Sequence, residues 1–161
     1  MTPEAYLQNA LEPALRLLPA RMDSRGGRAM VIAICLQESR LKHRRQVGGP
    51  ARGYAQFELG GGVRGVLTHP ATRQYIQIVL AALDYDPTSS AEDCWTAIEH
   101  QDILGAAFAR LLLWTLPGPL PEPGDAADGW RQYLSGWRPG KPHRGTWDAF
   151  YGTAWDTVMR K

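Results

Sequence analysis

The pattern of apolar and polar positions predicts a chain built mostly of helices. Apolar residues recur at intervals of three and four along most of the sequence, the spacing that places them on one face of an α-helix. Prolines, glycines and capping residues separate these segments from one another. The predicted helices cover residues 2–18, 25–38, 70–83, 89–98, 102–114, 126–136 and 146–159.

Two segments interrupt the helical pattern. Residues 43–65 are rich in glycine and in basic residues, which predicts a loop or a small β-hairpin. Residues 116–124 contain repeated prolines that exclude a helix, and we interpret them as a stiff surface loop. Too little chain follows this loop to form a second domain. The sequence therefore predicts one mainly α domain over residues 1–161, with a glycine-rich loop or hairpin.

Composition narrows the class of protein. The chain has 161 residues, of which 44% are hydrophobic, enough for one domain with a substantial core. A formal net charge of +2 argues against a nucleic-acid-binding protein and is compatible with an acidic polymer as partner. Cys35 and Cys94 lie among apolar residues, which predicts buried thiols. We find neither a signal peptide nor an apolar run long enough for a bilayer, so we predict no integral membrane segment.

Glu38 has the most suggestive position of any ionisable residue, at the end of the apolar helix predicted over residues 25–38. Apolar surroundings and the negative end of the helix dipole both disfavour its charged form, so they are expected to raise its pKa. A raised pKa suits a general acid that works near neutral pH. On this local pattern alone, the alternative is an ordinary solvated glutamate.

A second motif follows at a defined distance. Glu38-Ser39 is followed, fifteen residues after the glutamate, by a segment that starts at Gly53 and continues Tyr54-Ala55-Gln56. This pair of motifs resembles the signature of the lytic transglycosylases and the related goose-type lysozymes. In that signature Glu-Ser ends a buried helix, and Gly-Leu-Met-Gln follows after a loop.

Two later stretches extend the resemblance. Tyr133–Gly136 is similar to the family's Tyr-Asn-x-Gly, and Asp102-Ile103 is similar to its Asn-Ile. The chain departs from the family pattern where Leu-Met becomes Tyr-Ala and where Leu134 replaces the asparagine.

The resemblance implies a lysozyme-like α+β fold whose groove cleaves the β-1,4 bond of peptidoglycan glycan strands, without a metal ion or cofactor. Glu38 would protonate the bridging oxygen and then accept the proton of the muramoyl C6 hydroxyl, which gives a 1,6-anhydro product. Ser39 would support the site, Gln56 would hold a sugar substituent, and Tyr133 would orient Glu38. Tyr54 would either stack on a sugar ring or pack the loop against the core.

Other functions remain open at this point. Glu58 follows the glutamine motif where goose-type lysozymes have an aspartate, so a hydrolytic muramidase with two carboxylates is one alternative. A virion structural or glycan-binding protein without activity is another. The tail Trp130–Trp155 resembles bacteriophage proteins of this type. It implies synthesis in a host cytoplasm and action in the periplasm or on the cell wall, in contact with other virion proteins if it is a virion component. The four histidines lack zinc-ligand spacing.

Overall fold

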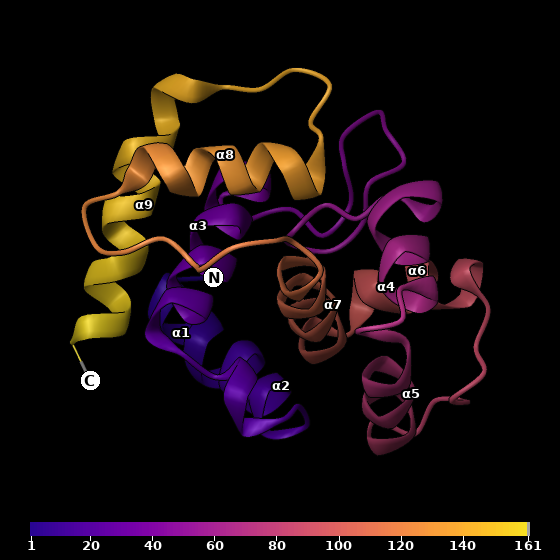
Figure 1. Cartoon of the computed structure of the whole chain (residues 1–161). Coiled ribbons are helices and arrows are strands. Elements are labelled where there is room, and N and C mark those ends of the chain that lie inside the picture. The colour runs from indigo at the N-terminus through magenta and orange to yellow at the C-terminus, as the bar shows by residue number, and fades with distance from the viewer. Residues whose placement is uncertain (161) are drawn as a thin grey trace.

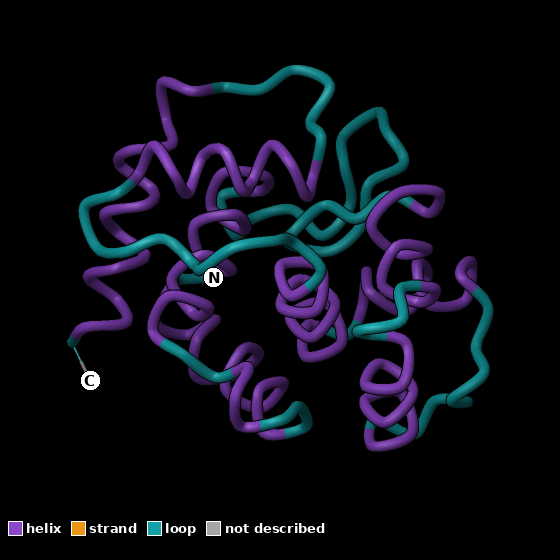
Figure 2. The backbone as a smooth tube through the Cα atoms, in the orientation of Figure 1, coloured by secondary structure: helices purple, strands orange, loops and turns teal. Residues whose placement is uncertain are grey.

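The protein is described by a computed structural model that covers residues 1–160, and these residues are mainly helical (Figure 1). No strand occurs among them (Figure 2), so the mainly α prediction is confirmed and the small β-hairpin is wrong. The helices are α1 (Pro3–Tyr6), α2 (Glu12–Arg16), α3 (Arg25–Ser39), α4 (Arg64–Thr68), α5 (Arg73–Ala82), α6 (Ala91–His100), α7 (Asp102–Trp114), α8 (Ala126–Trp137) and α9 (Arg144–Met159).

Of the two predicted forms of the glycine-rich segment, the loop is present and the hairpin is not: the segment has only two isolated bridges, which share one residue. Arg52 pairs with Arg45 on one side and with Phe57 on the other. Each pairing stops after one residue because the chain turns sharply at Gly53, whose φ is +74°. A ladder needs several consecutive pairs, so the segment stays a folded loop.

The predicted helix over residues 2–18 is one helical run with a wider turn in its middle. A π-helical turn, Leu7–Leu11, joins α1 to α2. Pro13 follows this turn and has no amide hydrogen to donate, which favours a local departure from the α-helical ladder. The amide of Glu12 accordingly donates to the carbonyl of Leu7, five residues back.

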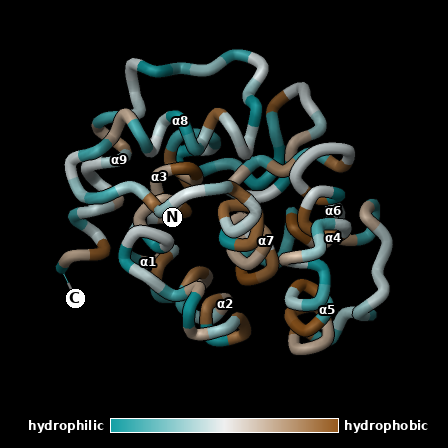
Figure 3. Tube along the Cα trace, in the orientation of Figure 1, coloured by the Kyte–Doolittle hydropathy of each residue, from teal (hydrophilic) through white to brown (hydrophobic). Residues whose placement is uncertain are grey.

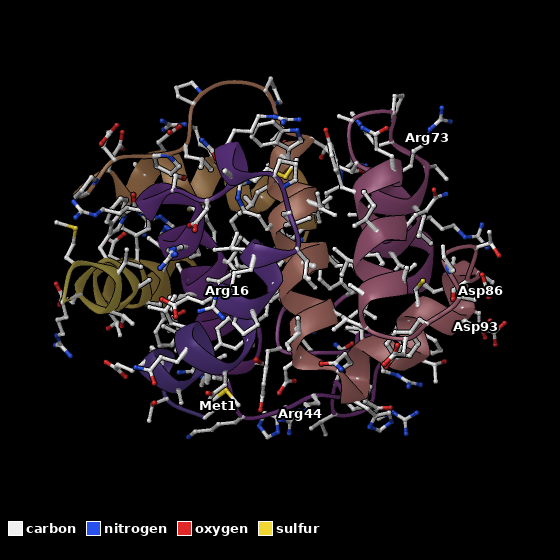
Figure 4. All side chains as sticks on the ribbon, turned by 90° about the horizontal axis from the view of Figure 1, so that it is seen from below. Met1, Arg16, Arg44, Arg73, Asp86 and Asp93 are labelled. Atoms are coloured by element: carbon white, nitrogen blue, oxygen red, sulfur yellow. The ribbon has the colours of Figure 1, made fainter. Side chains whose placement is uncertain are left out.

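Helix α3 is the centre of the core. Residues 29–36 are all buried, because the helix is apolar on nearly every side and packs most extensively against α9. Helix α7, also strongly hydrophobic (Figure 3), joins this core to the group formed by α4, α5 and α6. Figure 4 shows Arg73 of α5, Asp93 of α6 and Asp86 of the connection between them on the side of the molecule opposite α9.

Two local predictions need correction. Helix α4 and the π-helical turn Leu59–Val63 before it begin inside the segment predicted as loop, because Val63 and Val66 bury a short apolar face that a glycine-rich background conceals. Helix α6 begins at Ala91, two residues later than the predicted start at residue 89, because Ser90 caps it: its hydroxyl accepts from the amide of Asp93 at 3.1 Å.

Two further observations bear on the class of protein. Cys35 and Cys94 are both buried and free, as predicted. Among residues 1–160, no helix is both long and apolar enough to cross a membrane.

Candidate active site

Glu38 lies on the last turn of α3, where the helix meets a groove of about 610 Å³. The groove is formed by the end of α3, the loop 51–62, helices α7 and α8, and the segment 138–143. Three of the predicted site residues besides Glu38 line it. Its central polar and aromatic residues are Gln37, Glu38, Gln56, Glu58, Tyr133 and Trp137.

Helix α3 ends abruptly just after Glu38. Arg40 and Leu41 both have φ values of +55°, which is left-handed backbone, and the amide of Arg40 donates to the carbonyl of Leu36. The chain therefore leaves the helix axis at once, and Leu41 is buried. This sharp end keeps the side chain of Glu38 at the edge of the groove instead of inside a longer helix.

Tyr133 contacts Glu38 directly, as predicted. Its hydroxyl donates to Glu38 Oε1 at 2.5 Å, although the two residues are 95 positions apart. The Tyr133 ring is stacked on Trp147, with ring centroids 5.3 Å apart and planes 11° from parallel. The ring also lies 5.4 Å from Trp130. Because aromatic neighbours hold this ring, its hydroxyl orients the carboxyl of Glu38.

The groove raises the pKa of Glu38 above its usual range. Burial is the main cause, since it disfavours the charged form. The hydrogen bond from Tyr133 acts in the opposite direction, because it stabilises the carboxylate. The negative charge of Glu58 raises the pKa further. Glu38 is therefore suited to hold a proton and donate it in the groove.

Ser39 holds the following loop and does not face the groove. Its side chain is 3% exposed, and its hydroxyl donates toward the carbonyls of Tyr54 at 2.7 Å and Cys35 at 3.0 Å. It also accepts from the amide of Leu41 at 3.2 Å. Ser39 thus fastens the loop that carries Gln56 to the end of α3, which agrees with its predicted supporting role.

Gly53 permits the close approach of this loop to α6. A Cβ atom at Gly53 would lie 2.5 Å from Cγ2 of Ile98, closer than real Cβ contacts allow, and its φ is in the left-handed region. The glycine of the motif is thus required by both backbone conformation and packing. Gln56, also at positive φ, lies half-buried in the groove and donates from Nε2 to the carbonyl of Gly53 at 2.8 Å. Its side-chain oxygen has no partner among residues 1–160 and could accept a hydrogen bond from a ligand.

Tyr54 does not line the groove. Its side chain is 7% exposed, its ring meets Tyr6 edge-on with centroids 6.0 Å apart, and the guanidinium of Arg44 lies 4.8 Å from the ring centre. The prediction that Tyr54 stacks on a sugar ring in this groove is therefore wrong. The other interpretation, packing of the loop against the core, is what the structure contains.

Glu58 lies on the same loop as Gln56, two residues after it. It lines the groove and is exposed to solvent. Its charge reaches Glu38, as the effect on the pKa of Glu38 shows. The structure thus brings the two predicted carboxylates to one groove.

Asp102, which resembles an asparagine of the family motif, serves a different purpose. It accepts two hydrogen bonds from Arg44, at 2.9 and 3.1 Å, and does not line the groove. Arg52 similarly pairs with Glu99 at 2.8 Å, and its guanidinium lies 3.9 Å from the ring centre of Trp95. Arg44 and Arg52, two of the basic residues of the glycine-rich segment, therefore attach this segment to α6 and α7 through ion pairs.

The segment 138–143 adds a basic rim that the sequence did not assign to the site. Arg138, Lys141 and His143 line the groove. The side chain of Gln37 connects the base of this segment to α3, since it donates to the carbonyl of His143 at 2.8 Å and accepts from Thr146 at 2.9 Å. The dense run of basic residues, prolines and glycine around Trp137 was the only local signal for this rim.

Trp137 itself lines the groove. Its indole nitrogen donates to the carbonyl of Ala55 at 2.9 Å, and its ring centre lies 6.0 Å from that of Phe57. The tryptophan thus fastens the end of α8 to the loop opposite and forms an apolar wall between them.

The ionisable residues of the groove do not suggest a metal centre. No group of three or more histidine, cysteine, aspartate or glutamate side chains is placed to hold a metal ion in the described part of the chain.

No protein-family model, curated protein or solved structure matches this chain. Its function is therefore inferred from the groove and the residues that form it.

Proposed function

We propose that this protein is a lytic transglycosylase that cleaves the β-1,4 bond between N-acetylmuramic acid and N-acetylglucosamine in peptidoglycan. The observation that carries the proposal is a half-buried glutamate, Glu38, with a raised pKa and an orienting tyrosine, at the edge of a groove. The motif resemblance from Glu38 to Gln56 supports the same function. A lysozyme-like arrangement of the helices is part of this proposal.

In the proposed reaction, Glu38 begins protonated. It donates its proton to the bridging oxygen while the bond between that oxygen and C1 of the muramoyl residue breaks. The carboxylate then accepts the proton of the muramoyl C6 hydroxyl, whose oxygen forms a new bond to C1. The products are a 1,6-anhydro-muramoyl end and a free C4 hydroxyl, and Glu38 regains its proton. One carboxyl group suffices because the sugar supplies the nucleophile.

The surrounding residues have roles that fit this reaction. Tyr133 keeps the carboxyl of Glu38 in one orientation, and the free side-chain oxygen of Gln56 can accept from an N-acetyl amide or a hydroxyl. The groove volume of about 610 Å³ is in the range of ligand sites that enclose small molecules. The basic rim of Arg138, Lys141 and His143 suits the carboxylates of the muramoyl residue and its peptide.

One observation supports a hydrolytic alternative. Glu58 lines the same groove, and its charge raises the pKa of Glu38. A second carboxylate placed to activate water would make the protein an inverting muramidase. Action at the cell wall, from a phage particle or during host lysis, stays a prediction under either reaction.

Mass analysis of the fragments released from purified peptidoglycan tests the proposal. Anhydro-muramoyl ends are expected from the transglycosylase, whereas reducing ends would assign the hydrolase. Binding to peptidoglycan without release of fragments would contradict both reactions and leave a glycan-binding protein. The Glu38→Gln variant serves as the matched blank, because it keeps the size of the side chain and loses the acidic proton.

A further inference from the structure

A second pocket lies on the other side of the α7–α8 wall from the groove. On α7, Leu112 lines the groove, whereas the next two residues, Leu113 and Trp114, line the second pocket. On α8, Tyr133 lines the groove, whereas its neighbour Gln132 lines the second pocket. The second pocket has a volume of about 320 Å³ and is covered by the proline-rich loop between α7 and α8. This loop crosses the front of the molecule in Figure 1.

Arg110 is the buried charge of this pocket. Its side chain is 2% exposed, and its Nε donates to the carbonyl of Met22 at 2.7 Å. Its two terminal amines have no acceptor among residues 1–160. Asp23, the carboxylate whose charge reaches Arg110, is already held by two hydrogen bonds from Arg28, at 2.7 and 2.9 Å. Arg110 therefore has no carboxylate hydrogen-bonded to it: Asp23 offsets its charge only in part, and its guanidinium lies 5.4 Å from the ring centre of Trp114, which lines the pocket with it.

The pocket also lies at the positive end of α3. Ser24 lines it and caps this 15-residue helix by accepting from the amide of Gly27 at 3.0 Å. The first turn of the helix carries no acidic residue that would offset the helix dipole. Gly27 gives Arg110 the room to approach, since a Cβ there would lie 2.8 Å from its Nε.

A third positive group completes the arrangement. Arg21 lines the pocket, donates to the hydroxyl of Tyr75 at 2.6 Å and lies 5.8 Å from the ring centre of Trp114. No aspartate or glutamate lines this pocket among the described residues. Burial lowers the pKa of Arg110 to about 10, which still leaves it charged at neutral pH. A buried cation beside a positive helix end is costly without an anion.

We propose that this pocket binds an oxyanion, a carboxylate or phosphate group on a compact apolar body, with Arg110 as its central donor. The fork of a guanidinium pairs with two oxygens of such a group. Trp114, Leu116 and Leu120 form an apolar wall for the rest of the ligand. The site goes beyond the proposed cleavage reaction and does not depend on it.

Calorimetric titration at constant ionic strength tests the proposal with three matched probes: phenyl phosphate, phenylacetate and the neutral 2-phenylethanol. At least one anion is expected to bind with one-to-one stoichiometry, at least about tenfold more tightly than the alcohol. The tighter anion identifies the head group. At a hundredfold excess over its dissociation constant, it should raise the unfolding temperature by roughly 5–10 °C.

Three variants locate the binding. Arg110→Met should weaken binding at least about tenfold, because it removes the fork and keeps an apolar side chain of similar length. Arg21→Met, at an exposed position, should weaken binding severalfold and provides the decisive result if the Arg110 variant does not fold. Arg16→Met, an exposed residue of α2 labelled in Figure 4, should bind as the unmodified protein does.

Three results would overturn the proposal. The first is an alcohol that binds as tightly as the anions. The second is an absence of binding by every probe at about 10 mM. The third is anion binding that neither the Arg110 nor the Arg21 variant weakens.

Discussion

The two ends of α3 present the same electrostatic problem with opposite sign. At its C-terminal end, the negative end of the helix dipole, lies the acid Glu38; at its N-terminal end, the positive end, lies the cation Arg110. Each group is placed where its own charge is disfavoured, and burial shifts the pKa of each toward the neutral form.

The two groups respond differently because their reference pKa values differ. A glutamate with a raised pKa can become neutral near physiological pH and then serve as a proton donor. An arginine stays protonated, so its buried charge persists until an anion compensates it. The comparison teaches that burial which disfavours charge has different consequences for the two groups: it favours a neutral, proton-holding Glu38, whereas Arg110 keeps its charge.

The largest expected effect comes from removing the acid at the C-terminal end. Glu38→Gln should reduce peptidoglycan cleavage by about 10²–10⁴-fold, because the amide has no acidic proton to donate. Release of soluble fragments from purified peptidoglycan measures this effect. Cleavage at the unmodified rate would remove Glu38 from the reaction and refute the assignment.

Unfolding of the same variant provides its control. The folded-state pKa of Glu38 is raised above the reference value of 4.5, so the folded state holds this proton more tightly than the unfolded state. The resulting stability is present below pH 4.5 and is lost as the pH rises through the folded-state pKa. Glutamine does not ionise, so at neutral pH Glu38→Gln should unfold at a temperature no lower than the unmodified protein. A much lower temperature would attribute the lost activity to misfolding.

Ser24 and Ser39, at the two ends of α3, allow the two ends to be compared by the same substitution. Ser39→Ala should cost about 1–3 kcal/mol in the free energy of unfolding, because it leaves the carbonyl of Tyr54 buried without its donor. It should also lower activity, since the loop with Gln56 loses its attachment. Ser24→Ala removes only a helix cap and should cost about 1 kcal/mol. Denaturant unfolding and cleavage assays of both variants measure the difference; equal activity in the two would contradict the role of Ser39.

Removing the hydroxyl of Tyr133, which orients Glu38, should lower the rate of peptidoglycan cleavage less than Glu38→Gln does. Tyr133→Phe keeps the ring stacked on Trp147 and removes the hydrogen bond to Glu38. Activity should fall about tenfold, a loss typical of one hydrogen bond to a charged or reacting group. Because this bond lowers the pKa of Glu38, the pH profile should shift toward higher pH. Tyr151→Phe, whose hydroxyl instead donates to the carbonyl of Glu122 at 2.6 Å, should leave the profile in place.

The smallest effect on the cleavage rate is expected at Glu58. Its effect on the pH profile should be opposite in direction to that of Tyr133→Phe. Glu58 raises the pKa of Glu38, so Glu58→Gln should shift the pH profile toward lower pH. For a transglycosylase the maximum rate should change by less than about threefold, because the second carboxylate takes no part in the chemistry. A loss as large as that of Glu38→Gln, together with reducing-end products from the unmodified protein, would favour the hydrolase instead.

Much of the fold could be predicted from the spacing of apolar residues. The long helices α3, α7, α8 and α9 have strong periodicity or continuous apolar faces, and their predicted ends lie within two residues of the observed ones. Short α4 escaped prediction because one turn of apolar residues among glycines has no detectable period. The hairpin was wrong because glycine content indicates a turning backbone but does not say whether strands pair on either side of it.

The residues of the candidate site also fall into two groups: those that the local sequence could identify and those that depend on contacts with distant segments. Glu38 could be recognised because its own helix supplies both the apolar surroundings and the dipole that disfavour its charge. Tyr54 could not be placed, because its direction depends on contacts with Tyr6 and Arg44 from other segments. The basic rim could not be assigned either, since Gln37 connects that segment to α3 across more than 100 residues of chain.

The sequence by itself determined that the chain is mainly helical and that an acid ends one of its apolar helices, because both follow from interactions between near neighbours. Only the tertiary structure decided that Tyr133 meets Glu38, 95 residues away along the chain, and that Arg110 reaches the carbonyl of Met22 beside the N-terminal end of α3, 88 residues away. These contacts result from how the helices pack, and packing depends on the shapes of many side chains at once. No local pattern of residues records it.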